Sequence, residues 1–330
     1  MLIGIDVGGT KIAAGLVGQQ FRLLARIEMP TPCKGDSRGL TEAICRVIER
    51  LLDAENTNRR DIRGIGIGIG GIVDKGKGCV LSWPNMQLSN LYLATTLEHK
   101  YQVPVFLEND VNAGLLGEKY LGAAQGASNV IGLFLGTGLG GAIIVQDRII
   151  TGAHQAAGEI GHMVVDDEGP LCTCGNYGCV EAFVGRWAID RDIRAALRQG
   201  QQSILSEKIP IDRNILVESS SIREALEKGD ALARAIIGGV ACKLSLVCIS
   251  LRHLLDPELI VFGGGLIGVC GQYIMPLVKE AVAHDPYHNS LPVCRVVVGE
   301  LGADAVILGA AVSAARALGR EILTSRPCPE

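Results

Sequence analysis

Residues 2–17 read LIGIDVGGTKIAAGLV, two apolar runs on either side of a Gly8-Gly9-Thr10 turn. Apolar runs of this length around a Gly-rich turn predict a β-hairpin. A second stretch, residues 129–145 (NVIGLFLGTGLGGAIIV), has the same order of strand, Gly-rich turn with a Thr, and strand. We interpret the pair as an internal repeat in which one hairpin leads each half of the chain.

The rest of the chain alternates between strand and helix patterns. Strands are expected at residues 21–28, 62–72, 103–107, 258–263 and 296–299. Helices are expected over 40–51 (capped by Asp36 or Ser37), 110–121, 182–200, 222–228, 231–255 and 305–318. Residues 149–181 are rich in turns, 201–221 are polar and least regular, and the tail beyond Arg320 is expected to fray. The alternation predicts an α/β protein with mixed sheets.

Composition limits the classes of protein that fit this chain. Its 330 residues suffice for two domains, and 48% hydrophobic against 20% charged residues favours a folded core over disorder. The formal charge of −4 argues against nucleic acid or an anionic membrane as a partner. We expect neither a membrane span, since no run of 18 residues is uninterruptedly apolar, nor a signal peptide. Eleven scattered cysteines favour a reducing cytoplasm.

The first Gly-rich turn is a candidate phosphate site. A hairpin turn made of Gly8, Gly9 and Thr10 exposes backbone N–H groups that can cradle phosphate oxygens. Lys11 would add a positive charge, and Asp6 at the end of the strand would orient a hydrated Mg²⁺. An ordinary hairpin without a ligand is the alternative.

The second turn, Gly136-Thr137-Gly138, begins a GTGLGG sequence that formally matches the dinucleotide fingerprint G-x-G-x-x-G. That fingerprint must open a helix, whereas a strand-like run, AIIV, follows here. We therefore predict a second phosphate hairpin. Residues 71–78 (GIVDKGKG) have the spacing of a P-loop but lack its Ser or Thr, and we expect a turn there.

Two more segments join a strand to a Gly-rich or polar turn. Glu108-Asn109-Asp110 lies at a predicted strand-to-helix junction. Asp110 is either the N-cap of the helix or a carboxylate that points into a cleft and accepts a proton from a hydroxyl. Residues 255–265 (LDPELIVFGGG) end a strand in three glycines, which would let a flat ring lie against the backbone. A plain strand-to-helix turn is the alternative.

A set of metal-binding residue types lies in the turn-rich stretch. His162, Cys172, Cys174 and Cys179 have the spacing H-x₉-C-x-C-x₄-C. Four such donors suit tetrahedral Zn²⁺, and a full set of protein ligands predicts a structural site. The alternative, free buried thiols, fits the polar TCGNYG sequence poorly. The His162 nitrogen that is not on zinc would stay available for a partner.

Together these segments resemble the motifs of the ROK family of sugar kinases, in the family's order and over nearly the whole chain. The matching segments are DVGGTK (6–11), END (108–110), LGTGLGGA (135–142), GEIGH (158–162) with CTCGNYGCVE (172–181), and DPELIVFGGG (256–265). The resemblance implies an actin-like ATPase fold, a duplicated RNase H-like architecture of two lobes around a central cleft. Residues 1–120 with the last helix (305–320) would form the small lobe. Residues 121–304 would form the large lobe with the zinc motif.

The resemblance also implies an activity and a set of site residues. The expected reaction is ATP-dependent phosphorylation of a hexose, glucose first, on its 6-hydroxyl, with Asp110 as the general base. The sugar would be held by Gly71, Asn85, Asn109, Asp110, Glu159, His162 and Glu181. ATP would be held by Asp6, Gly8, Gly9, Thr10, Lys11, Gly136, Thr137, Gly138, Gly264 and Gly265, together with Mg²⁺. Structural zinc on His162, Cys172, Cys174 and Cys179 would connect to the sugar through His162, and a homodimer or homotetramer is expected.

Several alternatives stay open at this point. The alternatives to glucose as the substrate are N-acetylmannosamine, N-acetylglucosamine, fructose, mannose and allose. Polyphosphate is the alternative to ATP as the phosphoryl donor. The sugar side departs from the family, because Gly70-Gly71 replaces a common Pro-Gly and WPNMQL around Asn85 matches only in part. A non-catalytic sugar sensor is the second class, since some family members are repressors with a preceding helix-turn-helix. The early hairpin, the charge and Asp110 favour the enzyme, and a zinc-ribbon module would explain too little of the chain.

Overall fold

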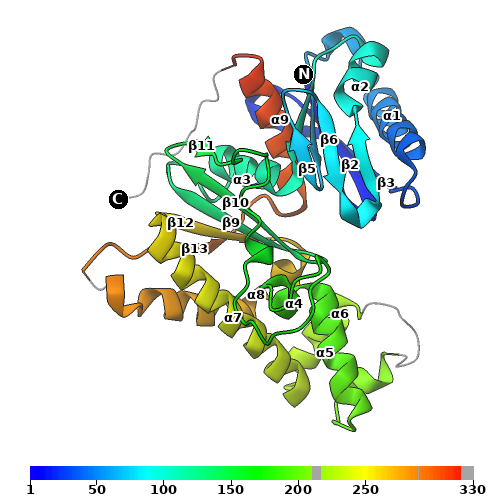
Figure 1. Cartoon of the computed structure of the whole chain (residues 1–330). Helices are drawn as coiled ribbons and strands as arrows, with labels where there is room; N and C mark the ends of the chain where they lie inside the picture. The colour runs from blue at the N-terminus through cyan, green and yellow to red at the C-terminus, as the bar shows by residue number, and fades with distance from the viewer. Residues whose placement is uncertain (210–216, 289, 321–330) are drawn as a thin grey trace. The chain divides into compact units, whose positions relative to one another are not determined.

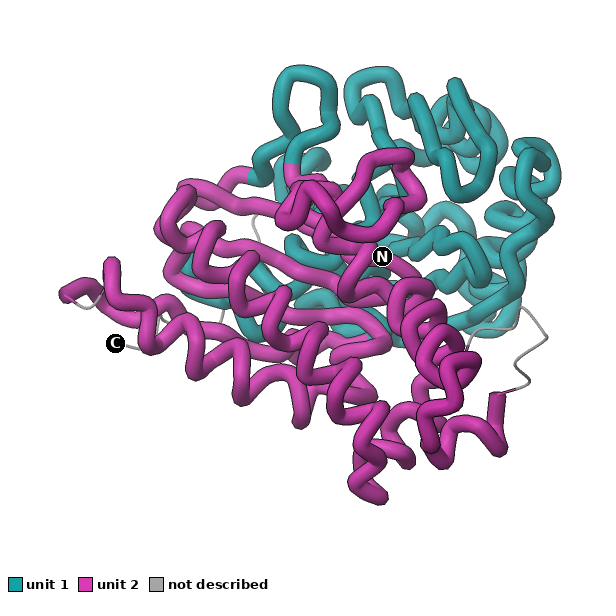
Figure 2. The backbone as a smooth tube through the Cα atoms, turned by 60° about the horizontal axis from the view of Figure 1, so that its bottom comes forward, with its two compact units in different colours: residues 1–127, 149–157, 303–330 teal, residues 128–148, 158–302 magenta. Residues whose placement is uncertain are grey.

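The computed structural model describes residues 1–209, 217–288 and 290–320 (Figure 1). The chain forms two compact units (Figure 2). Unit 1 comprises residues 1–127, 149–157 and 303 onward, and unit 2 comprises residues 128–148 and 158–302. The tail beyond Arg320 and residues 210–216 of the polar stretch, for which we expected little regular structure, lie outside the described residues.

Each unit contains a five-stranded mixed sheet, and the two sheets have the same strand order. In unit 1 the order is β3 (Leu23–Pro30), β2 (Lys11–Val17), β1 (Leu2–Val7), β4 (Ile65–Ile69) and β8 (Val105–Asn109). In unit 2 it is β11 (Arg148–Ile149), β10 (Leu139–Val145), β9 (Val130–Leu135), β12 (Leu259–Gly263) and β13 (Arg295–Val298). In both, an antiparallel hairpin is followed by two parallel strands. This confirms the internal repeat and the duplicated RNase H-like, actin-like fold.

Unit 1 follows most of the predicted elements. Its helices are α1 (Ser37–Ala54), α2 (Leu93–Tyr101), α3 (Asp110–Leu121) and α9 (Ala305–Ala317). Asp36 is the N-cap of α1, because its carboxylate accepts a hydrogen bond from the Gly39 N–H at 2.7 Å. The buried face of α1 packs in one core with β1 and β4.

The sequence patterns missed part of unit 1. The run predicted as one strand over 62–72 ends at Ile69, and a turn at Gly70-Gly71 leads into a separate small sheet. That sheet consists of β5 (Ile72–Asp74), β6 (Cys79–Trp83) and β7 (Leu88–Leu91). Residues 71–78, with P-loop spacing, form the hairpin of β5 and β6, so the predicted turn is confirmed. Helix α2 was also not predicted.

Unit 2 carries the helices α4 (Glu181–Val184), α5 (Arg186–Arg198), α6 (Ser219–Glu227), α7 (Ala231–Leu255) and α8 (Gly265–Ala283). Helix α7 has the predicted bounds. The single helix predicted over 182–200 is instead broken at Gly185, whose ψ of 151° is extended. Helix α8 was not predicted; it begins at Gly265, directly after the glycine-rich turn.

Helices α7 and α8 are long and apolar enough to cross a membrane by length and composition, although we expected no such segment. The expectation counted uninterrupted apolar runs, whereas these helices reach mean hydropathies of 1.9 and 1.3 with polar residues interspersed. Of their most apolar windows, 50% and 44% are buried. The buried side chains, such as Leu244, Val247 and Ile274, form the core of unit 2. Packing in this core accounts for much of the hydropathy of both helices.

Helix α9 packs directly on the backbone of the first sheet. A Cβ atom on Gly4 of β1 would lie 2.0 Å from the Ile307 carbonyl oxygen, and one on Gly66 of β4 would lie 1.9 Å from that of Ala310. Both oxygens belong to α9, so the helix contacts two neighbouring strands with no side chain between. The glycine content of the β-segments therefore serves packing here as well as turns.

The other side of α9 packs equally closely on α3, and this contact can be tested. A Cβ on Gly309 would lie 1.7 Å from the Ala113 carbonyl oxygen. Gly309→Ala should lower the free energy of unfolding by about 1–3 kcal/mol, because overpacking outweighs the better helix propensity of Ala. Gly239→Ala, in a part of α7 with no atom within 4 Å of the new Cβ, should be neutral or stabilising by up to about 1 kcal/mol. Equal thermal unfolding midpoints for the two variants would contradict the close contact.

Candidate active site and metal centre

The β8–α3 junction of unit 1 holds the proposed base. The Asn109 side chain is the N-cap of α3, and its Oδ1 accepts hydrogen bonds from the N–H groups of Val111 at 2.9 Å and Asn112 at 3.1 Å. Asp110 is therefore the first residue of the helix, and its interpretation as the N-cap is wrong. Its Oδ1 lies 3.0 Å from the Val111 nitrogen, at the positive end of the helix dipole. The Asp110 residue is half-buried.

The same junction contacts a second residue predicted for sugar binding. Asn109 Nδ2 donates to the Gly71 carbonyl oxygen at 3.1 Å. Gly71 has a φ of +86°, and a Cβ there would lie 2.2 Å from the Ser82 carbonyl oxygen, so only glycine fits. Asn85 lies exposed in the turn Pro84–Met86 between β6 and β7.

Asp6 lies near Asp110 within unit 1. In the sheet register Asp6 is opposite Gly68 of β4, and a Cβ on Gly68 would lie 3.6 Å from the Asp110 Cα. Desolvation in the protein, followed by the negative charge of Asp110, raises the pKa of Asp6 to about 7. The positive charge of Lys11 lowers the pKa of Asp6. Two carboxylates are thus held together at the end of β1.

The first Gly-rich turn is closed by backbone hydrogen bonds, one within the turn and one from the residue after β3. The Gly8 N–H donates to the Lys11 carbonyl at 2.9 Å, and the Thr31 N–H donates to the Thr10 carbonyl at 3.0 Å. Gly9 and Thr10 are exposed to solvent. Lys11 forms an ion pair with Glu28 at 3.2 Å on the exposed edge of the sheet. The predicted cation therefore already has a carboxylate partner.

In unit 2 the two segments predicted for nucleotide binding meet. A Cβ on Gly264 would lie 2.3 Å from the Leu135 carbonyl oxygen, and Gly264 has a φ of +89°, so both space and backbone require glycine. Leu135 ends β9, directly before the turn of Gly136-Thr137-Gly138, and Gly265 opens α8. The turn and the N-terminus of α8 are thus adjacent, and both present backbone N–H groups.

Glu181 connects this turn to the cysteine-rich loop. Its Oε2 accepts from the Leu139 N–H at 3.0 Å, and a Cβ on Gly138 would lie 1.9 Å from the same oxygen. Its Oε1 accepts from Thr173 Oγ1 at 3.2 Å and from Trp187 Nε1 at 3.4 Å. Because each carboxylate oxygen has two lone pairs, Glu181 can still accept a further hydrogen bond.

The predicted Cys₃His set is assembled in unit 2. The four donor atoms of His162, Cys172, Cys174 and Cys179 lie within 4.8 Å of one another. His162 Nδ1 is 3.6 Å from Cys172 Sγ, and the Sγ atoms of Cys174 and Cys179 are 3.7 Å apart. A tetrahedron around zinc at ordinary Zn–S and Zn–N lengths has edges of about 3.4–3.8 Å. The donors therefore fit a tetrahedral metal ion.

The remaining predicted sugar residue, Glu159, lies beside this loop. It precedes the turn Ile160–His162 and is exposed to solvent. Desolvation by neighbouring protein raises the pKa of Glu159, His162 lowers it and Glu181 raises it. The electrostatic coupling places the three predicted sugar residues of unit 2 near one another.

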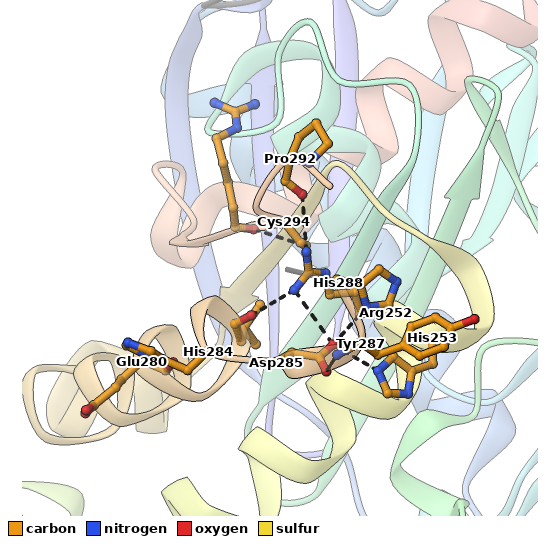
Figure 3. A network of polar contacts seen from close by, with 11 residues as sticks. Arg252, His253, Glu280, His284, Asp285, Tyr287, His288, Pro292 and Cys294 are labelled. Atoms are coloured by element: carbon orange, nitrogen blue, oxygen red, sulfur yellow. Dashed lines mark hydrogen bonds and ion pairs between the residues drawn. The ribbon is translucent and has the colours of Figure 1, made fainter. Parts of the chain in front are cut away.

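A second cluster of metal-binding residue types was not predicted (Figure 3). His253, Asp285 and His288 bring their donor atoms within 4.8 Å of one another. His253 Nε2 and His288 Nδ1 lie 2.9 and 2.8 Å from the same Asp285 Oδ2, and Arg252 Nη1 is 3.8 Å away. Burial raises the pKa of Asp285, but hydrogen bonds from His288 and His253 outweigh it and hold the pKa at about 2. These are hydrogen-bond distances, and Arg252 already compensates the charge, so we assign an ion-pair network.

Two sheets of one topology, each led by a Gly-rich hairpin, define a duplicated RNase H-like protein. More specifically, the chain belongs to the ROK family, whose model matches residues 2–317.

Individual relatives include both enzymes and repressors. The glucokinase of Thermotoga maritima is 32% identical over 311 residues, which cover 94% of this chain and 96% of that protein. A ROK family glucokinase from Streptomyces griseus, solved in complex with glucose and AMPPNP, has a TM-score of 0.82 at 32% identity over 96% of this chain and 99% of that one. The xylose repressor of Caldicellulosiruptor bescii is 30% identical over 312 residues, which cover 93% of this chain and 76% of the repressor.

Proposed function

We propose that this protein is an ATP-dependent hexose kinase that phosphorylates the 6-hydroxyl of its sugar, with glucose as the preferred substrate. The observation that carries the proposal is the half-buried carboxylate of Asp110 at the start of α3, coupled to Asp6 at the end of β1. A carboxylate placed there can accept the hydroxyl proton as the phosphoryl group is transferred. The glucokinase relatives of similar length support the same activity.

Unit 2 supplies the other groups that the proposal needs. Glu159, His162 and Glu181 are suited to pair with sugar hydroxyls, since carboxylates accept and an imidazole donates or accepts. The adjacent turns at 136–138 and 264–265 would hold ATP through backbone N–H groups. Mg²⁺ bound with ATP neutralises charge on the phosphates, and Asp6 is the carboxylate of this chain proposed to face it.

For the Cys₃His set we propose structural zinc. Four protein donors leave no open position, so the ion would order the loop and take no part in the chemistry. His162 contributes Nδ1 to the cluster, which leaves Nε2 to a sugar hydroxyl. Metal binding and sugar binding would thereby share one side chain.

A sugar-sensing role is the second candidate, because relatives at 30% identity include a xylose repressor. A sensor needs the sugar residues but not a general base, so the carboxylate at Asp110 favours the kinase. Sugar-dependent ATP hydrolysis or phosphorylation distinguishes the two functions. Cytoplasmic location is part of the proposal, since none of the ten described cysteines is in a disulfide and ATP is a cytoplasmic substrate.

Replacing the proposed base tests the reaction directly. Asp110→Asn should lower kcat by about 10²-fold or more, the size expected when a general base is lost. Sugar binding should largely survive, because the amide keeps a hydrogen-bond acceptor. Asp53→Asn, at an exposed position of α1 in the same unit, is the control and should retain full activity. A near wild-type rate for Asp110→Asn would show that Asp110 is not the base.

Metal analysis tests the second part of the proposal. We expect about one zinc per chain, as a Cys₃His set binds one ion. Cys174→Ser should release zinc and raise the KM for the sugar, whereas Cys242→Ser, an exposed thiol of α7, should change neither. Removal of zinc by chelation with no change in sugar affinity would contradict the link through His162.

A panel of sugars tests the substrate. Glucose should have the highest kcat/KM among glucose, N-acetylmannosamine, N-acetylglucosamine, fructose, mannose and allose, each assayed with ATP and Mg²⁺ and with polyphosphate. Deoxyglucose analogues should lose about tenfold to a hundredfold in kcat/KM where Glu159 and His162 pair with hydroxyls, since each unpaired polar group costs about 1–3 kcal/mol. A sugar that exceeds glucose by more than about tenfold, roughly 1.4 kcal/mol, would replace glucose in the proposal. Inactivity on every sugar with both donors would reject the kinase.

A further inference from the structure

A buried carboxylate stands directly before the proposed base. Glu108 is the penultimate residue of β8 and is 2% exposed. Its Oε2 is paired with the ammonium group of Lys75, which lies in the turn between β5 and β6. The Lys75 side chain is 36% exposed, so it reaches from the surface to the buried carboxylate.

The other oxygen of Glu108 is bonded to the start of α3. Oε1 accepts from the Asn109 N–H at 3.2 Å and from Asn112 Nδ2 at 3.3 Å. One carboxylate thus connects the β5–β6 turn with the first turn of the helix that begins at Asp110. The hydrogen bond from Asn109 Nδ2 to the oxygen of Gly71, just before β5, is a second connection between the small sheet and the same junction.

We propose that Lys75 and Glu108 are positioning residues that fix the β8–α3 junction and thereby orient Asp110 and Asn109. The inference rests on the proposed kinase function. A buried carboxylate is stable only when it is paired and hydrogen-bonded. Without the Lys75 charge, the Glu108 carboxylate is stabilised by rotating toward water. The Asn109 N–H and Asn112 Nδ2 then lose their hydrogen-bond acceptor. Displacements of about 1 Å at such a site can cost about 10²-fold in rate.

The neighbouring Lys77 provides a matched control. It lies in the same β5–β6 turn and pairs with Asp74 at 2.9 Å, with 67% of its side chain exposed. A pair this exposed contributes little to the free energy of the protein. Lys77→Met therefore removes the same charge from the same turn and leaves Glu108 paired.

The experiment measures kcat and KM for the purified full chain, with the most active sugar of the panel, and thermal unfolding for each variant. Lys75→Met should lower kcat about tenfold or more, and Lys75→Gln should do the same, whereas Lys77→Met should stay within about twofold of wild type. Lys75→Arg, which keeps the charge, should retain most of the rate. The double variant Lys75→Met/Glu108→Gln should recover at least about fivefold over Lys75→Met, because no uncompensated charge is left.

The outcomes separate this inference from the proposed function. A wild-type chain that phosphorylates no sugar would overturn both. An active wild type with Lys75→Met and Lys77→Met at equal rates would overturn the positioning role alone. A slow Lys75→Met that Glu108→Gln does not rescue would also overturn it, because a loss of packing is not repaired by removing the partner's charge. If Lys75→Met fails to fold, Lys75→Gln takes its place in the comparison with Lys77→Met. A Lys75→Gln variant as fast as Lys75→Arg and Lys77→Met would overturn the positioning role.

Discussion

Unit 1 depends on one close contact, the packing of the α9 backbone against two strands and a helix. Gly4 and Gly66 bring α9 onto β1 and β4, and Gly309 brings it onto α3. Helix α9, at the end of the described chain, thus belongs to the same unit as β1, the first strand. Because α3 starts at Asp110, the same contact sets the distance between the proposed base and the end of β1.

That constraint has an electrostatic consequence. With α3 held close to the sheet, Asp6 and Asp110 cannot move apart, and the pKa of Asp6 rises to about 7 through desolvation and the neighbouring charge. Asp6 is therefore partly protonated near neutral pH, and a cation placed beside it, as in the proposed function, would favour the ionised carboxylate. The packing of α9 and the chemistry proposed for Asp110 are in this way parts of one arrangement.

Sequence patterns predicted what is local. The two hairpins, α7 and the start of α3 follow from apolar periodicity and turn residues within each segment. The small sheet of β5 to β7 could not be predicted in this way. Its turn at Gly71 is required by the close approach of Ser82 and Trp83, which are distant in sequence and leave no local pattern. The motifs predicted the contiguous candidate site residues for the same reason. The pairing of Lys75 with Glu108 and that of His253 with Asp285 were missed, since the two residues are 33 and 32 positions apart in the chain.

The duplication also explains how the proposed roles are divided between the units. Asp6 is the last residue but one of β1, and Phe134 holds the same position in β9. Asp6 lies opposite Gly68, next to the start of α3, whereas Phe134 lies opposite Gly263, where a Cβ would approach its ring to 2.7 Å. A carboxylate suits the unit that carries the proposed base and cation. The aromatic ring beside Gly263 carries no charge, so the negative charge at the second turn comes from Glu181, whose Oε2 accepts from the Leu139 N–H. The two halves thus share one strand order, and the side chains at this equivalent strand position differ in charge.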